Sequence, residues 1–593
     1  MIYFDFRRYR KLFAADFETS TGAWNCNARV WLWDICTEKY KHITGTNLDD
    51  FMTRIIRTSI NYLYFFRNLA YDGIYILQWL LENGYTHVKE DKLLPNTFTT
   101  IIGEQGQHYC YRIMGRLSQI VTIMDSLKTV NMSIESSANM YDLPIKKGHI
   151  DYDLYRDENW KPTQDELDYI HNDTEIDMRT IQINIKMGGV KFTQAGNARY
   201  LYKRLIGKDA YNTYFPKLDE ETDKYIRKAY RGGYVYCNPK YINRVLYNMV
   251  SLDKNSMYPA QMLHEPMPIG EPQFYTGEYK PNNLFPLYVQ HIRVSFDLKE
   301  NGIPTVAKKS GFLSSTDLYI SSSDGYLYDL YLSNPDMELF IMNYNIHSIE
   351  YIDGYMFRCN QGIEIKEEQA KNMTKQEIID ADGKGSIFYD YIHQWRMGKE
   401  YHKGAQRDYD KRMQNAHYGT FGSNPMRGQR IPYINDKGVI SFHDTEKTYQ
   451  DVGGYIPIAV FVTAWARYNL IKHIVKHIDD FVYCDTDSLY MLDRVNLNDF
   501  PINSTLYDYF KIEHYIYKFK CVGPKRYIYW GWTPDNPTIW EKHITCCGAD
   551  EEIKEQMDFD NFNRGAEFYG KKQAKTVIGG KIIVTTTYRL GKK

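Results

Sequence analysis

The sequence lacks the features that mark secreted, membrane-embedded or zinc-dependent proteins. Its nine cysteines are scattered over 593 residues without a CxxC pair, which argues against a disulfide framework and against a zinc site. No run of about 18 apolar residues is present. The first residues, MIYFDFRRYRKLF, lack the apolar core and cleavage site of a signal peptide. We therefore expect a protein of a reducing cytoplasm with no membrane segment.

The sequence also lacks an excess of charge of either sign. A net charge of −1 argues against a simple basic nucleic-acid binder. The charges are nevertheless unevenly distributed, because the segment 571–593 carries seven Lys or Arg residues and no acid, whereas acidic runs lie at 172–177 and 218–224. This asymmetry suits a basic channel with separate acidic sites, although from charge alone solvated tails are the better explanation.

The length and the patterning indicate several domains. A chain of 593 residues is too long for one hydrophobic core, and its 43% hydrophobic and 25% charged residues are typical of a soluble globular protein. In the first 190 residues, strand-like stretches (KLFAADFETS, NARVWLWDI) alternate with helix-like ones (LDDFMTRIIRTS, GIYILQWLLENG). This alternation predicts an α/β domain with a mixed sheet.

The rest of the chain predicts a different arrangement. Short aromatic strands broken by turn residues occupy 265–360, and the charged stretch 364–384 reads as an exposed helix or loop. A helical stretch covers 388–421, and a hairpin with a turn at 435–438 covers 432–442. An apolar helix, 456–478, then leads directly into YCDTDS (483–488).

A first set of acidic residues lies in the N-terminal third. In ADFETS, Asp16 and Glu18 would point to one face of a strand, and Tyr169 and Asp173 would share a helix face. Asp72 lies between them in NLAYDG. Taken singly, each is more plausibly a cap, a turn or a surface acid. Together, in the order D-x-E, N-x-x-x-D and Y-x-x-x-D, the carboxylates could hold two Mg²⁺ ions about 3.5 to 4 Å apart, with Tyr169 orienting a water.

A second set of acidic residues lies in the C-terminal two-thirds. Asp253 ends an apolar strand in SLDKNSMYPAQM, and Asp485 and Asp487 lie two positions apart in YCDTDS. Buried carboxylates repel each other and are costly to desolvate, so a site with bound cations would explain the pair. Asp253 alone would read as a helix cap or a turn. Thr486, between the two acids, should point to the other face and tolerate substitution best.

Three shorter signals lie between and beyond these acids. KRMQNAHYGTFG places Lys411, Asn415 and Tyr418 on one stripe of a helix, with Lys399 and Arg407 further back on the same predicted element. A surface helix is the default explanation, but a cation, an aromatic ring and Gly419 also suit a triphosphate and a base. The other two signals, each weak alone, are the loop YRGG (Tyr230, Arg231, Gly232, Gly233) and the tripeptide KRY (Lys525, Tyr527).

These motifs together resemble a known family. D-x-E, N-x-x-x-D and Y-x-x-x-D resemble the exonuclease motifs of proofreading DNA polymerases, and DKNSMYP, KRMQNAHYG and YCDTDS resemble motifs A, B and C of family B. KRY resembles the KxY motif, and TAWAR (463–467) resembles the short motif upstream of motif C. The long spacing from Asp253 to Lys411 and the insertion between Gly419 and Thr463 resemble the protein-primed branch, and within it the phi-twenty-nine-type bacteriophage polymerases.

The resemblance implies an α/β and α+β multidomain fold. A ribonuclease H-like 3′→5′ exonuclease domain would precede a right-hand polymerase domain of palm, fingers and thumb with two family-specific insertions. The implied boundaries are exonuclease 1–190, palm 191–264 and 457–530, first insertion 265–358, fingers 359–421, second insertion 422–456 and thumb 531–593.

The resemblance also implies roles for individual residues. The exonuclease metals would be bound by Asp16, Glu18, Asp72 and Asp173, assisted by Tyr169 and Lys147. The single-stranded 3′ end would be held by Asn68, Tyr71, Ser126 and Leu127. The polymerase metals would be bound by Asp253 and Asp487, supported by Asp485. The incoming nucleotide would be contacted by Lys399, Arg407, Lys411, Asn415, Tyr258 and Tyr418, with Tyr258 as a steric gate against a 2′-OH. The template, duplex or primer would be contacted by Tyr230, Arg231, Gly232, Gly233, Thr463, Arg467, Lys525 and Tyr527.

The implied activity is DNA-directed, protein-primed, strand-displacing synthesis of a linear viral genome with proofreading. The implied cofactor is Mg²⁺, for which Mn²⁺ can substitute, and the implied partners are template-primer DNA, dNTPs and a terminal protein docked on the first insertion. The second insertion would help to encircle DNA. We expect a monomer in the cytoplasm of the infected host, with no membrane partner.

The sequence departs from the family pattern at three places. Arg67 replaces the family His before Asn68, Ala416 replaces Ser in motif B, and residues 364–384 form an additional charged segment. We expect that segment to be an exposed elaboration whose deletion leaves polymerisation intact.

Two alternatives to a DNA polymerase remain at this point. A reverse transcriptase or RNA polymerase is one, although reverse transcriptases usually carry adjacent aspartates and lack the N-terminal acidic set. A non-catalytic scaffold that binds DNA or a primer protein is the other, although a scaffold has no need for two complete sets of acids.

Overall fold

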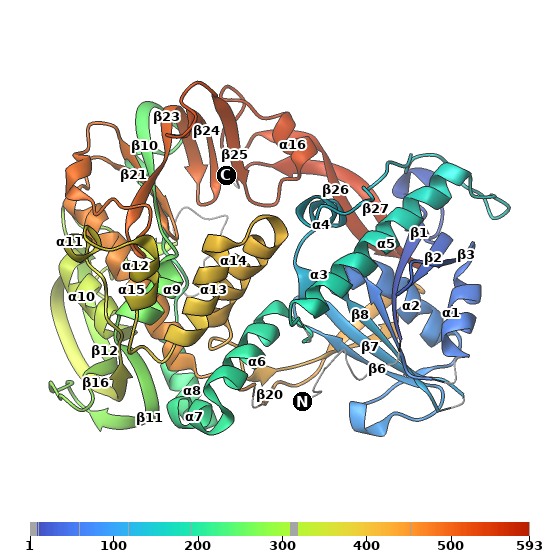
Figure 1. The fold of residues 1–593 in the computed structure, drawn as a ribbon, viewed down its shortest axis with the longest axis horizontal. Coiled ribbons are helices and arrows are strands. Elements are labelled where there is room, and N and C mark those ends of the chain that lie inside the picture. The colour runs from blue at the N-terminus through green and yellow to red at the C-terminus, as the bar shows by residue number, and fades with distance from the viewer. Residues whose placement is uncertain are drawn as a thin grey trace.

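The computed structural model describes residues 9, 11–57, 60–116, 118–189, 191–308, 318–450 and 452–591. Two large units lie side by side (Figure 1), an N-terminal unit on the right and a larger C-terminal unit on the left. Helix α6 (Gln194–Ile206) lies between them, and two β-hairpins of the larger unit reach back to the N-terminal unit.

The N-terminal unit is built on an eight-stranded mixed sheet in the order β3-β2-β1-β4-β8-β7-β6-β5. Strand β1 runs parallel to β4, and β4 runs parallel to β8, whereas β1–β2 and β7–β8 are antiparallel. The predicted mixed sheet, with its first two strands and first two helices, is confirmed. The strands are β1 Leu12–Thr19, β2 Val30–Thr37, β3 His42–Gly45, β4 Tyr62–Phe66, β5 Thr86–His87, β6 Thr97–Ile102, β7 His108–Met114 and β8 Ile120–Asp125; the helices are α1 Leu48–Ile56, α2 Leu69–Glu82, α3 Ser126–Val130, α4 Ile134–Met140 and α5 Gln164–Lys186.

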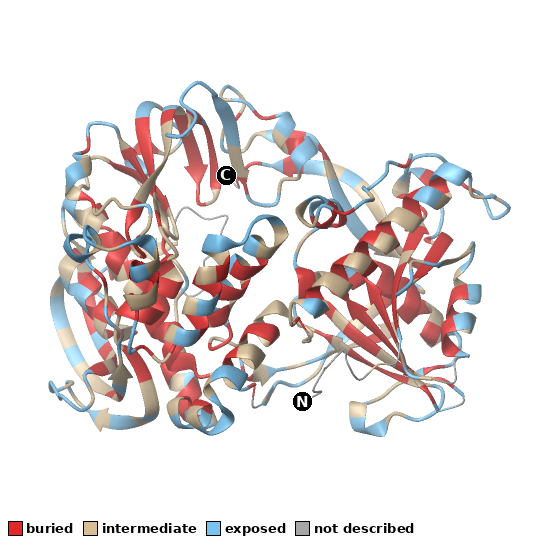
Figure 2. Cartoon of the chain, in the orientation of Figure 1, coloured by how far each residue is buried: buried red, intermediate tan, exposed pale blue. Residues whose placement is uncertain are grey.

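Helix α5, which carries Tyr169 and Asp173, packs against this sheet. It begins with a capping box, in which the Thr163 and Glu166 side chains each accept a backbone N–H of the other residue, and such reciprocal bonds fix the first turn. Its apolar face, which includes Tyr169 and Ile170, packs against Leu32 of β2. The sheet and the inner side of α5 are largely buried (Figure 2), so polar groups on that side lie in a desolvated space.

The larger unit is built on a seven-stranded antiparallel sheet in the order β25-β24-β23-β10-β22-β21-β9. Because β24 and β25 belong to it, the sheet continues past the predicted palm–thumb boundary at 530/531. Its strands are β9 Val235–Cys237, β10 Val245–Lys254, β21 Phe481–Asp485, β22 Ser488–Leu492, β23 Phe510–Gly523, β24 Arg526–Trp532 and β25 Glu541–Cys546.

Helices pack around this sheet and carry the remaining motifs. They are α7 Lys208–Tyr214, α8 Glu220–Arg227, α9 Met257–His264, α13 Tyr389–Tyr401, α14 Gly404–Gly419 and α15 Ile456–Lys476. The predicted helical stretch 388–421 is two helices, α13 and α14, packed against each other. Lys399 therefore lies on α13 and Arg407 on α14, and not on one element as the periodicity predicted.

The predicted aromatic strands of the first insertion form a four-stranded antiparallel sheet in the order β11-β16-β12-β15. They are not all short, because β16 is 17 residues long. The elements of this region are β11 Met267–Thr276, β12 Leu287–Leu298, β13 Val306–Ala307, β14 Tyr319–Ile320, β15 Tyr328–Ser333, α10 Asn334–Asn343 and β16 Tyr344–Asn360.

Two hairpins join the larger unit to the N-terminal unit. The predicted hairpin of the second insertion is confirmed as β18–β19, and its Ile440 packs into the core of the N-terminal unit. The C-terminal hairpin β26–β27 extends to the same unit (Figure 1), where the Lys581 carbonyl accepts a hydrogen bond from Tyr71 Oη at 3.2 Å. The elements are β17 Met426–Arg427, β18 Arg430–Ile434, β19 Ile440–Asp444, β20 Thr448–Tyr449, α16 Glu551–Glu555, β26 Glu567–Val577 and β27 Gly580–Arg589.

The expectation that 364–384 is an exposed elaboration is wrong for its second half. Helix α11 (Glu367–Ala370) has no buried residue, as expected. Helix α12 (Lys375–Ala381) buries Ile378 and Ile379, and Asp382, directly after it, is 2% exposed. The charged sequence concealed this packing because only two of the seven residues of α12 face inward.

Candidate active sites

Three predicted carboxylates meet at the centre of the seven-stranded sheet. Asp253, near the end of β10, pairs with Ser488, the first residue of β22. Asp485 ends β21, and Asp487 lies in the two-residue turn that follows. The first acid of YCDTDS therefore ends a strand and the second lies within the tight turn, so the two do not share a strand face. The antiparallel pairing of β10, β22 and β21 is what brings all three together.

Two lysines and a fourth carboxylate complete this cluster. Lys511 Nζ lies 2.9 Å from Asp253 Oδ2, and Lys525 Nζ lies 2.6 Å from Asp485 Oδ1. Burial raises the pKa of Glu513, with a further rise from Asp253. Sequence reasoning missed Lys511 and Glu513. Their place follows from the register of β23 against β10, in which Lys511 pairs with Asp253, and no sequence spacing shows that register.

The cluster holds more negative charge than its lysines neutralise. Burial raises the pKa of Asp487 to about 6, and the carboxylates of Asp253, Asp485 and Glu513 add to the rise. The raised pKa shows that the neighbouring lysines do not fully compensate the negative charge around Asp487. A group of carboxylates with uncompensated charge is suited to bind divalent cations.

The turn at Thr486 is tightly constrained, so the expectation that Thr486 tolerates substitution best is not supported. Its backbone is left-handed, with φ of 63°, and its N–H donates to the Tyr234 carbonyl at 2.8 Å. A Cβ on Gly233 would lie 2.9 Å from Thr486 Cγ2 and 2.7 Å from Tyr258 Oη. The YRGG loop therefore approaches the acidic turn closely, and a side chain at position 233 would force Tyr258 or Thr486 to shift.

The predicted helix stripe faces outward and carries the cations near the acids. Lys411 and Asn415 are exposed and Tyr418 is half-buried on α14, as the i, i+4, i+7 spacing predicted. Lys399 Nζ, on α13, donates to Ser256 Oγ at 2.9 Å. Burial lowers the pKa of Lys399 to about 8, and the nearby charges of Lys411, Lys511, Arg407 and Arg396 lower it further. This concentration of positive charge suits a polyphosphate.

Tyr258 and Tyr418 lie together beside the acids. Their ring centroids are 4.3 Å apart and the ring planes are inclined by 36°. Tyr258 is in the first turn of α9, five residues after Asp253, so the two tyrosines from α9 and α14 form one aromatic wall.

Other predicted DNA contacts are engaged within the protein. Arg467 is 5% exposed, pairs with Asp336 at 2.8 Å, and donates to the carbonyls of Arg231 and Gly232 at 3.0 and 2.8 Å. It therefore holds the YRGG loop in place. Thr463 is 1% exposed and bonds the Ala459 carbonyl. For these two residues the geometry favours a supporting position over direct contact with DNA.

Lys525 and Tyr527 of KRY have different surroundings. Lys525, in a left-handed turn before β24, pairs with Asp485 as described above, and its N–H donates to Tyr483 Oη at 3.0 Å. Tyr527, on β24, is 7% exposed, with its hydroxyl 3.1 Å from that of Tyr490. Lys525 therefore belongs to the acidic cluster, and contact of either residue with a primer stays a prediction.

The first acidic set also comes together, between β1, α2 and α5. Asp16 and Glu18 are on β1, Asp72 is buried in the first turn of α2, and Asp173 is on α5. Burial raises the pKa of Asp16 to about 8, with a further rise from Asp173, and burial also raises the pKa of Glu18 and Asp72.

Lys147 and two tyrosines border this set. Lys147 Nζ lies 3.3 Å from Asp173 Oδ2, whereas Asp173 Oδ1 is buried and has no hydrogen-bond partner among the described residues. An unpartnered buried oxygen within a group of repelling carboxylates fits a cation. The Tyr169 hydroxyl lies 2.7 Å from that of Tyr152, a residue that sequence reasoning missed.

The residues predicted to hold a single-stranded 3′ end line one edge of this set. Asp125 Oδ1, which was not predicted, accepts from the N–H groups of Asn68 and Leu127 at 3.0 and 2.9 Å. The Tyr71 hydroxyl lies 2.9 Å from Thr19 Oγ1. Ser126 is fully buried, with its hydroxyl 2.8 Å from Asp177 Oδ2, so it supports the site from behind.

Arg67, the departure from the family pattern, faces inward. Its guanidinium lies 2.8 Å from Asp177 Oδ1 and donates to the Met132 carbonyl at 3.0 Å. Asp177 was not predicted, although its i+4 spacing from Asp173 on α5 places it one helical turn further on the same face. The positive charge of Arg67 therefore compensates the negative charge of Asp177, next to the first acidic set.

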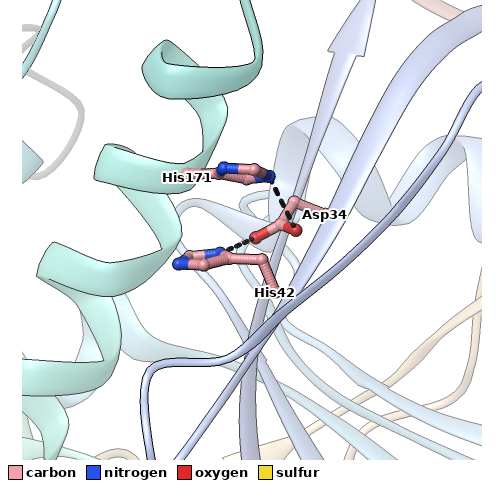
Figure 3. Close-up of side chains that lie close together, drawn as sticks. All are labelled: Asp34, His42 and His171. Atoms are coloured by element: carbon pink, nitrogen blue, oxygen red, sulfur yellow. Dashed lines mark hydrogen bonds and ion pairs between the residues drawn. The ribbon is translucent and has the colours of Figure 1, made fainter.

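A histidine cluster lies beside the first acidic set (Figure 3). Asp34 pairs with Asp16 across β2 and β1, and single ligand atoms of Asp34, His42 and His171 lie within 4.8 Å of one another, close enough to hold a metal ion. In this structure the Asp34 carboxylate already accepts from Thr174 at 2.6 Å and Thr44 at 3.2 Å, and lies 2.8 Å from His42 Nδ1. The cluster serves here as a hydrogen-bonded connection between α5 and β2–β3.

Comparison with known proteins decides the family. The profile of the family described as DNA polymerase type B, organellar and viral, matches residues 53–187, 154–363 and 381–504. The chain belongs to this family. Membership decides against a reverse transcriptase, an RNA polymerase and a non-catalytic scaffold, and the chain is a DNA polymerase.

The likeness to individual relatives covers almost the whole chain. The DNA polymerase of Bacillus phage Nf is 33% identical over 98% of this chain and 100% of the relative, and that of Bacillus phage phi29 is 32% identical over 98% and 99%. The solved structure of Phi29 DNA polymerase complexed with single-stranded DNA superposes with a TM-score of 0.88 at 31% identity, covering 98% of this chain and 100% of that one. Its complex with primer-template DNA and incoming nucleotide substrates gives 0.87, also at 31% identity, with 98% and 100% covered.

These likenesses confirm the predicted fold class, an exonuclease domain followed by a polymerase domain. In the described part of the chain, no helix combines the length and apolar character needed to cross a membrane.

Proposed function

We propose that this polymerase copies a linear viral genome by protein-primed, processive and strand-displacing synthesis and edits its product with a 3′→5′ exonuclease. The observation that carries the proposal is the presence of two separate clusters of partly or fully buried carboxylates in one chain. One cluster lies beside a group of cations and an aromatic wall, and the other lies on a ribonuclease H-like sheet. The solved complexes of Phi29 DNA polymerase with single-stranded DNA and with primer-template DNA and incoming nucleotides support it.

In the polymerase site, Asp253 and Asp487 would hold two Mg²⁺ ions, for which Mn²⁺ can substitute, and Asp485 and Glu513 would support them. When bound, the ions supply Lewis-acid stabilisation of the attacking and leaving oxygens. Lys399, Lys411 and Arg407 would neutralise the triphosphate, and Asn415 would contact the nucleotide. Tyr258 would close the sugar side against a 2′-OH, packed on Tyr418.

In the exonuclease site, Asp16, Glu18, Asp72 and Asp173 would hold the ions. Tyr169 would orient the attacking water, and Lys147 would balance the charge of Asp173. Asn68, Tyr71 and Leu127 line the edge at which the 3′ end would enter, with Ser126 behind them. The YRGG loop, Thr463, Arg467, Lys525 and Tyr527 would guide template and primer, directly or through the loop that Arg467 holds.

The insertions have distinct proposed roles. The four-stranded sheet of the first insertion would dock a terminal protein whose hydroxyl primes synthesis. The hairpins β18–β19 and β26–β27, which both rest on the exonuclease domain, would close a ring around DNA. The enzyme would act as a monomer in the cytoplasm of the infected host.

Rolling-circle extension tests the central part of this proposal. With Mg²⁺, dNTPs and a primed single-stranded circle, the wild type should give products much longer than the circle, and Asp253→Ala should give none. Products that stop at one circle length would contradict strand displacement. Transfer of the first labelled nucleotide to a candidate primer protein, without any oligonucleotide, tests priming separately.

A further inference from the structure

Between its second and third matched regions, the family profile leaves residues 364–380, most of the segment 364–384, unmatched. The second half of this segment is nevertheless built into the polymerase domain. Ile365 and Ile378 pack with Leu506 and Tyr509, which precede β23. The segment is therefore fixed on the protein at the point where the fingers helices begin.

Asp382, two residues after the unmatched stretch and within the matched region 381–504, is the centre of this attachment. It is 2% exposed, and both carboxylate oxygens are engaged. Arg396 Nη1 lies 2.7 Å from Oδ2, His264 Nε2 lies 2.9 Å from Oδ1, and the Ile365 N–H donates to Oδ1 at 3.1 Å. Although burial alone would raise the pKa of Asp382, His264 and Arg396 outweigh it and hold the carboxylate ionised.

The partners of Asp382 belong to elements that carry nucleotide-site residues. His264 ends α9, which begins next to Tyr258, and Arg396 lies one helical turn before Lys399 on α13. Arg396 is itself 4% exposed, so removal of Asp382 would leave a buried guanidinium without its only carboxylate partner in the described part of the chain.

Arg396 continues the connection to α14. Its guanidinium lies over the Tyr507 ring at 3.8 Å, and the Tyr507 hydroxyl accepts from Gln414 Nε2 at 2.7 Å. Gln414 directly precedes Asn415 on α14 and is buried, whereas Lys411 and Asn415 are exposed. A single line of contacts thus runs from Asp382 through Arg396 and Tyr507 to the helix of motif B.

We propose that Asp382 is a positioning residue for nucleotide binding, which through Arg396 fixes α13 and α14 so that Lys399 and Lys411 face the triphosphate, and against which the unmatched residues 364–380 are anchored. This inference rests on the proposed role of those two lysines. In this view the segment 364–384 helps to hold the fingers helices in position. Its deletion should therefore impair polymerisation, contrary to the expectation from the sequence.

The test is single-nucleotide insertion by Asp382→Asn, which keeps the shape of the side chain and removes its charge. KM for the dNTP should rise about tenfold while kcat stays within about twofold, and degradation of single-stranded DNA should be unchanged. The matched control is Asp380→Asn, because Asp380 lies on the same segment and contacts the same helix through His393 at 2.8 Å, but its side chain is 48% exposed. This control should behave as wild type.

A second variant separates positioning from general destabilisation. Arg396→Met should raise KM similarly, and the double variant Asp382→Asn/Arg396→Met should be no worse than the more impaired single variant, because both changes break one connection. An unchanged KM in Asp382→Asn, or an equal loss of kcat, exonuclease activity and thermal stability, would overturn the proposal. Wild-type enzyme that incorporates no nucleotide would instead refute the proposed function.

Discussion

Lys511 and Asp253 form an ion pair between paired residues of neighbouring strands, with 2.9 Å between Nζ and Oδ2. The Lys511 ammonium group therefore contacts one oxygen of the Asp253 carboxylate, a residue proposed to bind Mg²⁺. Burial, opposed by Asp253, Glu513 and Asp487, leaves the pKa of Lys511 above its usual value, so it stays charged. Lys511 is therefore, with Lys525, one of the two lysine cations that pair with carboxylates of this cluster.

Replacement of Lys511 should make folding more dependent on divalent ions. Without its charge, the carboxylates of the cluster repel each other, so Lys511→Met should lower the free energy of unfolding in EDTA by about 1 kcal/mol. Addition of Mg²⁺ should then raise the melting temperature more in the variant than in the wild type. Thermal unfolding with EDTA and with Mg²⁺ measures this, and an identical Mg²⁺ response of the two proteins would contradict the assignment.

The pKa of Lys399, lowered to about 8, predicts a pH dependence of nucleotide binding. A lysine with a depressed pKa is charged below that pKa and loses its charge as the pH rises through it. KM for the dNTP should therefore rise between pH 8 and pH 9, by up to about tenfold if the charge is required. Arginine keeps its charge in this range, so Lys399→Arg should show a flatter profile. Profiles of identical slope would exclude Lys399 as the titrating group.

Removal of two exonuclease carboxylates should separate the two activities. Asp16→Ala with Glu18→Ala should lower degradation of single-stranded DNA by about a thousandfold or more, because each loss removes a proposed metal ligand. Nucleotide incorporation on a matched primer should stay close to wild type. A gel assay of 3′-end trimming with and without dNTPs measures both, and trimming at the wild-type rate would refute the assignment.

Tyr258 should control the choice of sugar. Its ring packs on Tyr418 with 4.3 Å between centroids, which fixes its position beside the acids. Tyr258→Val opens space for a 2′-OH, so the ratio of kcat/KM values for ribonucleotides over deoxynucleotides should rise about tenfold or more. Tyr258→Phe, which retains the ring, is the control and should keep the wild-type preference.

Short motifs predicted the acids of both sites, whereas their surroundings depend on contacts that sequence spacing does not show. Asp253 and YCDTDS could be named because carboxylates in apolar strands are unusual. Lys511 and Glu513 could not, because their place follows from the β10–β23 register, which shifts between Ser251 and Leu252. The mixed sheet and the hairpin 432–442 followed from periodicity and turn residues.

The clearest failure concerns the segment 364–384. Its charged composition predicted exposure, but Asp382 is buried because Arg396 compensates its charge and His264 Nε2 lies 2.9 Å from its carboxylate, both from other elements. No sequence pattern around Asp382 predicts that Arg396 and His264 contact it. In the same way, nothing in TAWAR shows that Arg467 is committed to Asp336 on α10.

The account rests on Asp253 as a ligand of the polymerase metals, separate from the exonuclease. The most direct test is dNTP incorporation by Asp253→Asn on a primed template, with degradation of single-stranded DNA by the same preparation as the internal control. We predict a loss of incorporation of at least about a thousandfold with degradation at the wild-type rate. Incorporation that stays within a few-fold of wild type would contradict the account.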